Sequence, residues 1–570
     1  MRRGAGWRPR SGWLVLAPVL TVALLAGPVL AGLAGVLLPA FGWLPALGGE
    51  GPTLAPWRAL AEWPGLWPSL RLTLGTGFAA TLISLGVTLL FVAGWQGTRS
   101  FAAVVRLLSP LLSVPHAAAA FGLAFLIAPS GWIARAVSPA LTGWERPPDW
   151  LTVNDPAGLA LILGLVVKEV PFLLLMTLAA LGQADSRRSA LVAQTLGYGR
   201  VAGWFKVVLP RVWPQLRLPV LAVLAYSLSV VDMALILGPT RPPTLAVQVL
   251  VWMGHPDLAF RFVAAAGAAL MGLVVAGSLG VFWLGERGVA RLGRAWAEAG
   301  GRGRGLDVVA RPLGLGLAAL AAGLVLAGLA GLMVWSVAGL WRFPEVWPQG
   351  LGLGTWARAA PGLWAAGATT ALIGLVAVLV AVALVIGCLE AEDRAGGPPR
   401  RALWLIWLPL IVPQVAFLPG LQTLALVLGL DGGVAAVTAA HVVFVLPYVF
   451  LALADPWRAW DRRAGMVAAA LGAGPWRVLW AVRLPMLLRP VLTAAAVGFA
   501  VSVAQYLPTL LIGGGRVSTL TTEAVALAAG ANRRVIGVWA VAQMALPMLG
   551  FLIALAVPAL VFARRRGMAA

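Results

Sequence analysis

The sequence predicts an all-α integral membrane protein with about twelve transmembrane helices, arranged as two parallel six-helix repeats. Of its 570 residues, 61% are hydrophobic and only 11% are charged, whereas soluble domains are about 45–50% apolar and about 25% charged. Apolar runs of membrane-spanning length recur along the chain. In addition, one 24-residue stretch occurs twice, once in each half. A single soluble core stops growing at roughly 250–300 residues, so lipid is the expected solvent.

The first predicted helix follows a basic segment, MRRGAGWRPR. Its apolar run, 13–38, is longer than the ~7–15 residues of a signal-peptide core, so we expect a transmembrane helix. Further runs have the roughly 20 apolar residues that cross a bilayer. The predicted spans are 13–38, 68–95, 104–128, 157–183, 216–238 and 263–285 in the first half, and 312–340, 362–388, 403–429, 435–454, 490–513 and 537–562 in the second.

Charge predicts the orientation of these helices. The formal net charge is +22, and lysine occurs only at Lys168 and Lys206. With the N-terminus inside, the cytoplasmic segments hold 30 of the 42 arginines and lysines, which satisfies the positive-inside rule. We therefore expect a multi-pass membrane protein with both termini cytoplasmic. Arginines clustered between apolar runs suit membrane topology better than nucleic-acid binding, and the single cysteine, Cys388, excludes a disulfide framework.

The predicted domain organisation follows from these spans. Residues 1–285 form a first half, the Gly/Arg-rich segment 286–311 is a flexible cytoplasmic linker, and residues 312–570 form a second half. Each half crosses the membrane an even number of times, so the repeats are parallel and related by an axis along the membrane normal. We expect a solute path on that axis, between the halves.

The repeated stretch is the main functional feature of the sequence. Its copies, coupling loop 1 (187–210) and coupling loop 2 (462–485), are identical at 10 of 24 positions. A glycine just past a helix end permits a left-handed turn, and a Leu-Pro pair suits the first turn of the next helix. The sequence predicts a helix, a glycine turn and a short helix with aromatic and basic side chains. The residues that we assign to these loops are Gly197, Gly199, Trp204, Phe205, Val207, Leu209, Pro210, Gly472, Gly474, Trp476, Trp480, Val482, Leu484 and Pro485.

Two roles fit such a short helix. It can lie on the lipid surface, or it can enter a groove on a soluble partner. Two copies at equivalent places favour the partner.

The pattern of glycine, nine residues, a hydrophobic residue, one residue and Leu-Pro resembles the "EAA" loop of type I ABC transporter permeases. The resemblance is carried by Gly197, Val207, Leu209 and Pro210, and by Gly472, Val482, Leu484 and Pro485. It covers nearly the whole chain as two fused permease domains, and it is similar to binding-protein-dependent importers of the thiamine and ferric-iron type. The chain departs from the motif at its acidic residue, where Leu191 and Met466 stand.

The resemblance implies partners for the chain. These are two copies of an ATP-binding subunit gripping the coupling loops, and a periplasmic solute-binding protein delivering a small-molecule solute. The chain itself would perform no catalysis and bind no cofactor or metal. Consistently, neither lysine lies in the G-x-x-x-x-G-K-[ST] pattern that a P-loop requires, so ATP would be bound by the partner subunits.

Polar residues inside the predicted spans are candidates for the solute path. A charge inside a membrane costs ~2.5–3.5 kcal/mol on insertion scales, so such residues are functional candidates or bonded braces between helices. Lys168 and Asp232 are one candidate ion pair. The full set is Lys168, Glu169, Asp232, His116, Gln414, His441, Gln505 and Tyr506.

One alternative function stays open from the sequence, an ion-coupled secondary transporter with two parallel six-helix repeats. It would need no ATPase. Placement of the repeated motif in a cytoplasmic loop, and not at an intramembrane site, favours the ABC importer. An integral-membrane enzyme is disfavoured, because the three histidines do not lie at ligand spacing from acidic residues.

Overall fold

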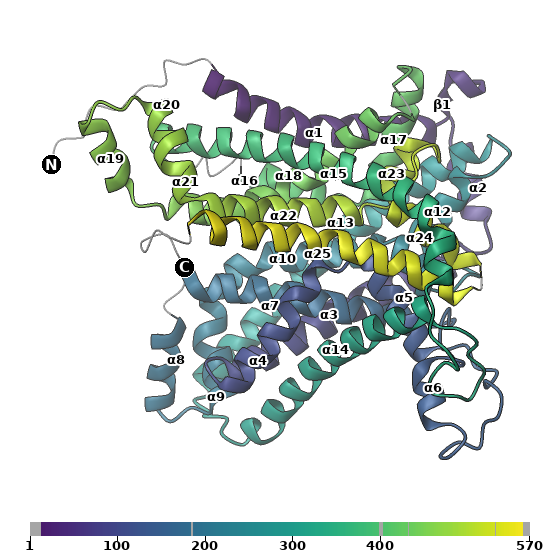
Figure 1. Cartoon of the computed structure of the whole chain (residues 1–570), viewed down its shortest axis with the longest axis horizontal. Coiled ribbons are helices and arrows are strands. Elements are labelled where there is room, and N and C mark those ends of the chain that lie inside the picture. The colour runs from purple at the N-terminus through teal and green to yellow at the C-terminus, as the bar shows by residue number, and fades with distance from the viewer. Residues whose placement is uncertain (1–12, 184–185, 398–402, 431, 531, 563–570) are drawn as a thin grey trace.

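The computed structural model describes residues 13–183, 186–397, 403–430, 432–530 and 532–562 (Figure 1). Ten helices in these ranges are long and apolar enough to cross a membrane, or up to twelve if two bent helix pairs each count as one span. The predicted all-α membrane class is therefore confirmed. The basic N-terminal segment, Arg400, Arg401 and the arginines at 564–566 lie outside the described residues.

The first half begins with one long helix and a small hairpin, in which Trp43 pairs with Glu50. Its elements are α1 (Trp13–Ala40), β1 (Trp43–Leu44), η1 (Pro45–Leu47), β2 (Gly49–Glu50), α2 (Ala55–Glu62), α3 (Leu66–Trp95), α4 (Arg99–Leu108), η2 (Ser109–Ser113), α5 (His116–Ile127), α6 (Trp132–Val137), α7 (Leu159–Gln183), α8 (Ser186–Thr195), α9 (Arg200–Gly203), η3 (Trp204–Val208), α10 (Leu209–Ser229), α11 (Asp232–Leu237), α12 (Leu245–Met253) and α13 (Phe260–Glu298).

The second half repeats this order from its own long first helix. Its elements are α14 (Leu306–Val337), α15 (Gly354–Ala395), α16 (Leu403–Ile411), α17 (Gln414–Val427), α18 (Val434–Arg458), α19 (Arg462–Ala470), α20 (Pro475–Val478), η4 (Leu479–Arg483), α21 (Leu484–Met486), α22 (Leu488–Ala504), α23 (Leu507–Gly513), α24 (Leu520–Ala526), η5 (Leu527–Ala529) and α25 (Arg533–Val561).

The third predicted span of each half is broken at prolines. In the first half α4 passes through the 3-10 turn η2 before α5 begins directly after Pro115. In the second half α16 and α17 meet at 89° on either side of Pro413. Proline has no N–H and disfavours helical geometry in the residue before it, which explains both breaks.

The first helix of each half packs against the other half. α1 lies along α17 and α15, and α14 lies along α3 and α5 (Figure 1). The crossings are glycine contacts: a Cβ on Gly420 would clash with the carbonyl oxygen of Gly32, and one on Gly328 would lie 2.8 Å from the carbonyl carbon of Gly122. Small residues let membrane helices approach backbone to backbone. The exchange therefore ties the two halves together.

The linker 286–311 is more ordered than the flexible tether that its composition suggested. α13 continues to Glu298 and α14 starts at Leu306, so a short loop of 299–305 joins them. The segment after 286 is rich in Ala and Arg, which favour helix. Its glycines are confined mainly to the short loop.

The two ends of the bundle differ in content (Figure 1). At one end α1 begins and α25 ends, and the elements α8–α9 and α19–α20 of the coupling loops project there from separate sides. At the opposite end lie α2, α6, α12 and α24 together with the hairpin. Both coupling loops thus face the same side of the membrane-spanning core.

Candidate functional site

Both coupling loops turn at the predicted glycine. Gly197 has φ +82° and Gly472 has φ +86°, the left-handed conformation in which a side chain is disfavoured. The short helix that follows begins at Arg200 in coupling loop 1 and at Pro475 in coupling loop 2, and each passes into a π-helical turn, η3 and η4. The repeated sequence therefore folds as a repeated structure.

The exit from each coupling loop differs from the sequence expectation that Leu-Pro starts a separate helix. In coupling loop 1 the helix continues from Arg200 to Ser229 through η3, with Leu209 and Pro210 at the join. A π-helical turn rearranges the hydrogen bonds just before Pro210, so its missing N–H does not end the helix. In coupling loop 2 the bend, 75°, comes at Leu487, two residues beyond Pro485.

Both coupling loops expose an equivalent apolar triplet. Leu191, Val192 and Leu196 are 55%, 52% and 60% exposed, and Met466, Val467 and Leu471 are 62%, 61% and 84% exposed. These residues match one to one at the repeat offset of 275. A repeated exposed apolar group at the end of a bundle is typical of a protein-binding surface.

Coupling loop 1 is covered by the linker. The carboxylate of Asp307 accepts hydrogen bonds from the backbone N–H groups of Arg200 (2.7 Å) and Val201 (2.9 Å). The N–H of Gly199 donates to the carbonyl of Arg302 (2.8 Å), and Lys206 donates to the carbonyl of Gly301 (2.7 Å). The linker thus satisfies the free donors at the start of this short helix.

The aromatic residues of coupling loop 1 face inward as a result. Trp204 is 3% exposed, and its indole N–H donates to the side-chain oxygen of Gln96 (3.3 Å). Phe205 packs edge-on against Trp204, with ring centroids 5.4 Å apart, and is half-buried, as is Val207. These side chains hold the loop against the bundle end.

Coupling loop 2 is open by comparison. Trp476 is 45% exposed and Trp480 is 66% exposed, and a Cβ added to Gly474 would meet no atom within 4 Å. Val482, Leu484 and Pro485 are half-buried below them. The same predicted element thus presents aromatic rings to the surroundings in one half and buries them in the other.

An ion-pair network anchors coupling loop 2 to the end of α15. The guanidinium of the buried Arg483 lies 3.1 Å from the carboxylate of Glu390 and 2.8 Å from that of Asp393. Arg462 also bonds Asp393, and Arg458 makes a two-point contact with Glu392 at 2.7 and 3.0 Å. Arginine is well suited to such forked contacts with carboxylates.

The second group of predicted site residues lies inside the membrane-spanning core. Lys168 is buried in α7, and its ammonium donates to the backbone carbonyls of Leu111 (3.1 Å) and Val114 (2.7 Å). These carbonyls lie at the break between η2 and α5. No direct ion pair between Lys168 and Asp232 is present in the described residues, although the two charges interact at longer range. The candidate pairing is replaced by bonds to the break, where the carbonyl of Leu111 also accepts the backbone N–H of Val114 (3.3 Å).

Glu169 and Asp232 lie near aromatic and imidazole groups. The carboxylate of Glu169 is 4.0 Å from Nε2 of His116, and the His116 ring lies 4.9 Å from that of Tyr226, centroid to centroid. Asp232 begins α11 directly after a break in the fifth span, and α11 packs against α5, the helix that starts at His116.

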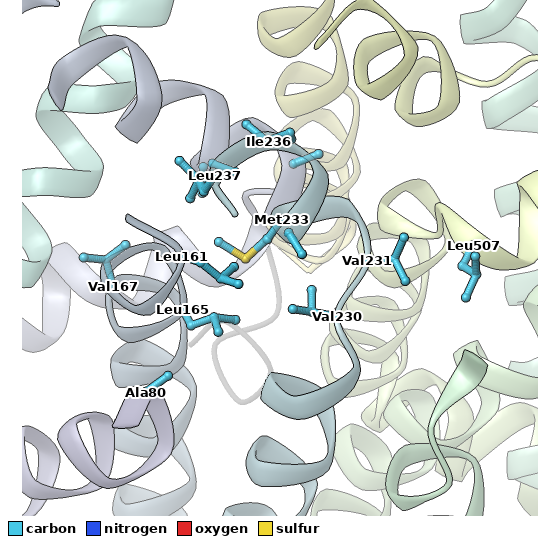
Figure 2. Close-up of a cluster of buried hydrophobic side chains, with 14 of the residues drawn as sticks. Ala80, Leu161, Leu165, Val167, Val230, Val231, Met233, Ile236, Leu237 and Leu507 are labelled. Carbon is cyan, nitrogen blue, oxygen red and sulfur yellow. The ribbon is translucent and has the colours of Figure 1, made fainter. Parts of the chain in front are cut away.

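The second half contributes the facing residues. Its fifth span breaks at the equivalent place, between α22 and α23, where Gln505 and Tyr506 stand. The side chain of Gln414 donates to that of Gln505 at 3.5 Å. Figure 2 shows Met233, Ile236 and Leu237 of α11 packed beside Leu161 and Leu165 of α7, with Val231 on the side nearest Leu507 of α23. The two breaks therefore approach each other across the interface between the halves.

His441 is the predicted path residue that the structure places apart from this group. It is buried in α18, with one ring nitrogen 2.8 Å from the hydroxyl of Ser502 and the other 2.8 Å from that of Thr509. Both nitrogens thus have partners within the second half. The geometry is that of a brace between helices.

Several residues of these sites were missed from the sequence. Tyr226 joins the intramembrane group beside His116, and Asp307, Glu390 and Asp393 anchor the coupling loops. One signal was available, because the chain has only four tyrosines and three of them, Tyr226, Tyr448 and Tyr506, lie in or beside predicted spans. The acids carried no comparable local signal for the coupling loops, since their contacts with Arg200 and Arg483 span 90 to 107 residues.

Comparison with known proteins places the chain among transporters. No protein-family model matches it. It is 35% identical over 500 residues to the inner membrane ABC transporter permease protein YnjC of Escherichia coli (strain K12), covering 88% of this chain and 89% of that protein.

Shorter matches point the same way. The molybdenum transport system permease protein ModB of Mycobacterium tuberculosis is 29% identical over 188 residues, covering 31% of this chain and 70% of that protein. The putrescine transport system permease protein PotI of Escherichia coli (strain K12) is 28% identical over 125 residues, covering 20% of this chain and 44% of that protein. The extent of the YnjC match, together with the helical bundle and the repeated coupling loops, shows that the chain belongs to the ABC transporter permeases.

Proposed function

We propose that this permease forms the solute path of an importer and that its two coupling loops dock on two separate ATP-binding subunits. The observation that carries the proposal is the pair of equivalent exposed triplets, Leu191, Val192 and Leu196 in one half and Met466, Val467 and Leu471 in the other. Each triplet lies at the same end of the bundle, beside a left-handed glycine turn (Figure 1). Two similar surfaces suit two copies of one partner.

The path in this proposal runs between the halves, along the polar group at the paired breaks of the fifth spans. A periplasmic solute-binding protein delivers the solute at the end that carries α2, α12 and α24. The protein crosses the bacterial inner membrane many times, with both termini on the cytoplasmic side together with the coupling loops. The loops transmit closure of the ATP-binding subunits to the bundle, whose halves have two arrangements.

ATP hydrolysis in this proposal belongs to the partner subunits, and the permease supplies only the path and the coupling. Membership of the ABC permeases also decides against the ion-coupled secondary transporter. Closure of the partners must move the bundle through the coupling loops. The side chains that first meet the partner therefore control both binding and transport.

Purification of the tagged chain with its complex tests the proposal. In mild detergent, native mass spectrometry is expected to give two P-loop subunits per chain, and the complex should drive ATP-dependent uptake in proteoliposomes. Replacing Trp476 and Trp480 together with serine removes two exposed rings from coupling loop 2, and buried interface aromatics commonly contribute about 2 kcal/mol or more each. We expect one ATP-binding subunit to be lost and uptake to fall at least tenfold.

The matched control is Trp364→Ser, which removes a ring that is 81% exposed near the start of α15, far along the helix from the loops. It should leave both the stoichiometry and uptake unchanged. A preparation that transports solute without any P-loop subunit would overturn the proposal. So would full retention of both subunits and of uptake in the double tryptophan variant.

A further inference from the structure

The last helix of the first half continues well beyond the membrane. α13 has 39 residues, whereas about 20 are enough to cross a bilayer. The guanidinium carbon of Arg287 lies 3.4 Å from the centroid of the Trp283 ring. One step before it, Glu286 bonds Arg217 at 2.9 Å and accepts from the indole N–H of Trp213 at 2.8 Å. Tryptophans and charged residues gather where a helix leaves the lipid, so α13 leaves it near Glu286.

The α13 extension, residues 286–298, leads away from the lipid. At about 1.5 Å per residue it reaches roughly 18 Å beyond Glu286. Every residue from 289 to 298 is exposed. α13 passes this level as one helix that contains no proline, so it does not turn to lie flat on the membrane surface. The side chains of the extension therefore face water.

One side of the α13 extension is apolar. Val289 is 70% exposed, Leu292 is 72% exposed and Trp296 is 38% exposed, and their spacing of three and four residues places them on one side of a helix. The same period places Arg291 and Arg294 on the opposite side. These three apolar residues are called the α13 stripe. An apolar stripe that water surrounds is typical of a binding surface.

The α13 stripe is connected to coupling loop 1. The ammonium of Lys206 lies 4.5 Å from the centroid of the Trp296 ring and 5.3 Å from that of the Tyr198 ring, within the range of cation–π attraction. Tyr198 directly follows the turn glycine Gly197 and stands two residues after Leu196 of the exposed triplet. A partner that covers the triplet therefore lies beside the α13 stripe.

We propose that the α13 stripe is a docking surface for the ATP-binding subunit that meets coupling loop 1. The inference rests on the proposed function, because it takes docking on that loop as given. A lipid surface is the other common partner of a basic amphipathic helix, but the extension leads the stripe away from the lipid. The equivalent helix of the second half, α25, ends at Val561 and carries no such extension in the described residues. The surface therefore serves one of the two subunits.

Photo-crosslinking in the whole complex tests this docking. Benzoylphenylalanine replaces Leu292 of the α13 stripe, or Arg294 on the opposite side as the matched control. A third protein carries it at Trp480 of coupling loop 2. Each complex is irradiated in nanodiscs of phosphatidylethanolamine and phosphatidylglycerol, and adducts are identified by mass spectrometry. We expect Leu292→benzoylphenylalanine to crosslink the ATP-binding subunit at least tenfold more than the control, with at most one subunit per chain.

The outcomes separate the inference from the proposed function. Adducts of the Leu292 probe with phospholipid alone, or equal yields from the probes at Leu292 and Arg294, overturn the docking surface. If the Trp480 probe crosslinks the ATP-binding subunit and the Leu292 probe does not, the proposed function stands and the docking surface falls. If neither probe reaches that subunit, both fall.

Removal of the α13 stripe gives the second measurement. Val289→Ser with Leu292→Ser should raise the dissociation rate of one fluorescently labelled ATP-binding subunit about tenfold or more, because two apolar side chains lose their burial. Ala290→Ser, at an exposed position outside the stripe, should leave that rate unchanged. An unchanged rate in the double variant overturns the docking surface.

Discussion

The two coupling loops share a sequence but differ in what surrounds them. In coupling loop 1, Asp307 and the linker carbonyls cover the short helix, and Phe205, the position equivalent to Trp480, is half-buried. In coupling loop 2 no linker covers the equivalent helix in the described residues, and Trp480 is 66% exposed. The identical positions, above all the turn glycines, give the common shape. The positions that differ decide how each loop is attached.

Both coupling loops lack the acidic residue of the family motif, and their surroundings supply carboxylates instead. Leu191 and Met466 stand where the family pattern has a carboxylate, and both are exposed. Carboxylates reach each loop from elsewhere, from Asp307 of the linker to coupling loop 1 and from Glu390 and Asp393 of α15 to coupling loop 2. Attachment to the bundle therefore does not require an acid within the loop. It requires one at the end of a neighbouring long helix that lies beside the loop.

The largest effect is expected when coupling loop 2 is given the apolar residue that anchors coupling loop 1. Arg483 occupies the position of Val208, and both are buried. Arg483→Val removes the charged contacts to Glu390 and Asp393, at about 1.5–3 kcal/mol for each hydrogen bond to a charged group, while Arg394 stays bonded to Glu390. Hydrogen exchange of amides 475–487 should accelerate on the order of a hundredfold or more, since each 1.4 kcal/mol is about tenfold.

Two further variants serve as controls for this prediction. Arg483→Val combined with Glu390→Val removes both charges and should recover most of the lost protection, because an apolar pair of this kind is often neutral. Arg477→Val, at an exposed position of the same short helix, should change exchange little. Equal exchange in Arg483→Val and the parent protein would show that the ion pairs do not hold the loop.

A single methyl group tests the cover over coupling loop 1. A Cβ on Gly199 would lie 2.7 Å from the carbonyl oxygen of Gly303 in the linker, whereas one on the equivalent Gly474 meets nothing within 4 Å. Gly199→Ala should displace the linker at about 1–3 kcal/mol, as overpacking does, and lower ATP-dependent uptake several-fold. Gly474→Ala is its matched control and should leave uptake unchanged. If Gly199→Ala and Gly474→Ala had the same ATP-dependent uptake, the linker that covers coupling loop 1 would make no difference to coupling.

The sequence predicted those features of the site that depend on local chemistry. Hydropathy located the spans, and Gly197 and Gly472 indicated their turns because a left-handed residue past a helix end favours glycine. The parallel repeat followed from the 24-residue stretch. The breaks before His116 and Gln414 were not predicted, because hydropathy treats each third span as one continuous apolar run. Yet the break in the first half supplies the carbonyls that accept from Lys168.

The features that escaped prediction are long-range. The contact of Asp307 with coupling loop 1 spans 107 residues, and that of Glu390 with Arg483 spans 93. The exchange of α1 and α14 between the halves likewise depends on glycines far apart in the sequence, such as Gly32 and Gly420. No periodicity in one segment reports which distant segment will satisfy its polar groups. These partners meet only once the two halves have folded against each other.

The smallest predicted effect concerns the carboxylate that joins the linker to coupling loop 1. Asp307→Ala removes the acceptor of two backbone N–H groups, those of Arg200 and Val201, and loss of such a cap costs about 0.5–2 kcal/mol. Hydrogen exchange at residues 199–204 should rise about threefold to thirtyfold, with coupling loop 2 unaffected. Asp307→Asn keeps one acceptor oxygen and should lie between. Asp461→Ala, which removes the cap of α19 instead, should raise exchange only in the second half. If Asp307→Ala left hydrogen exchange at residues 199–204 unchanged, the carboxylate of Asp307 would not stabilise coupling loop 1. The packing of Trp204 would then have to hold the loop against the bundle.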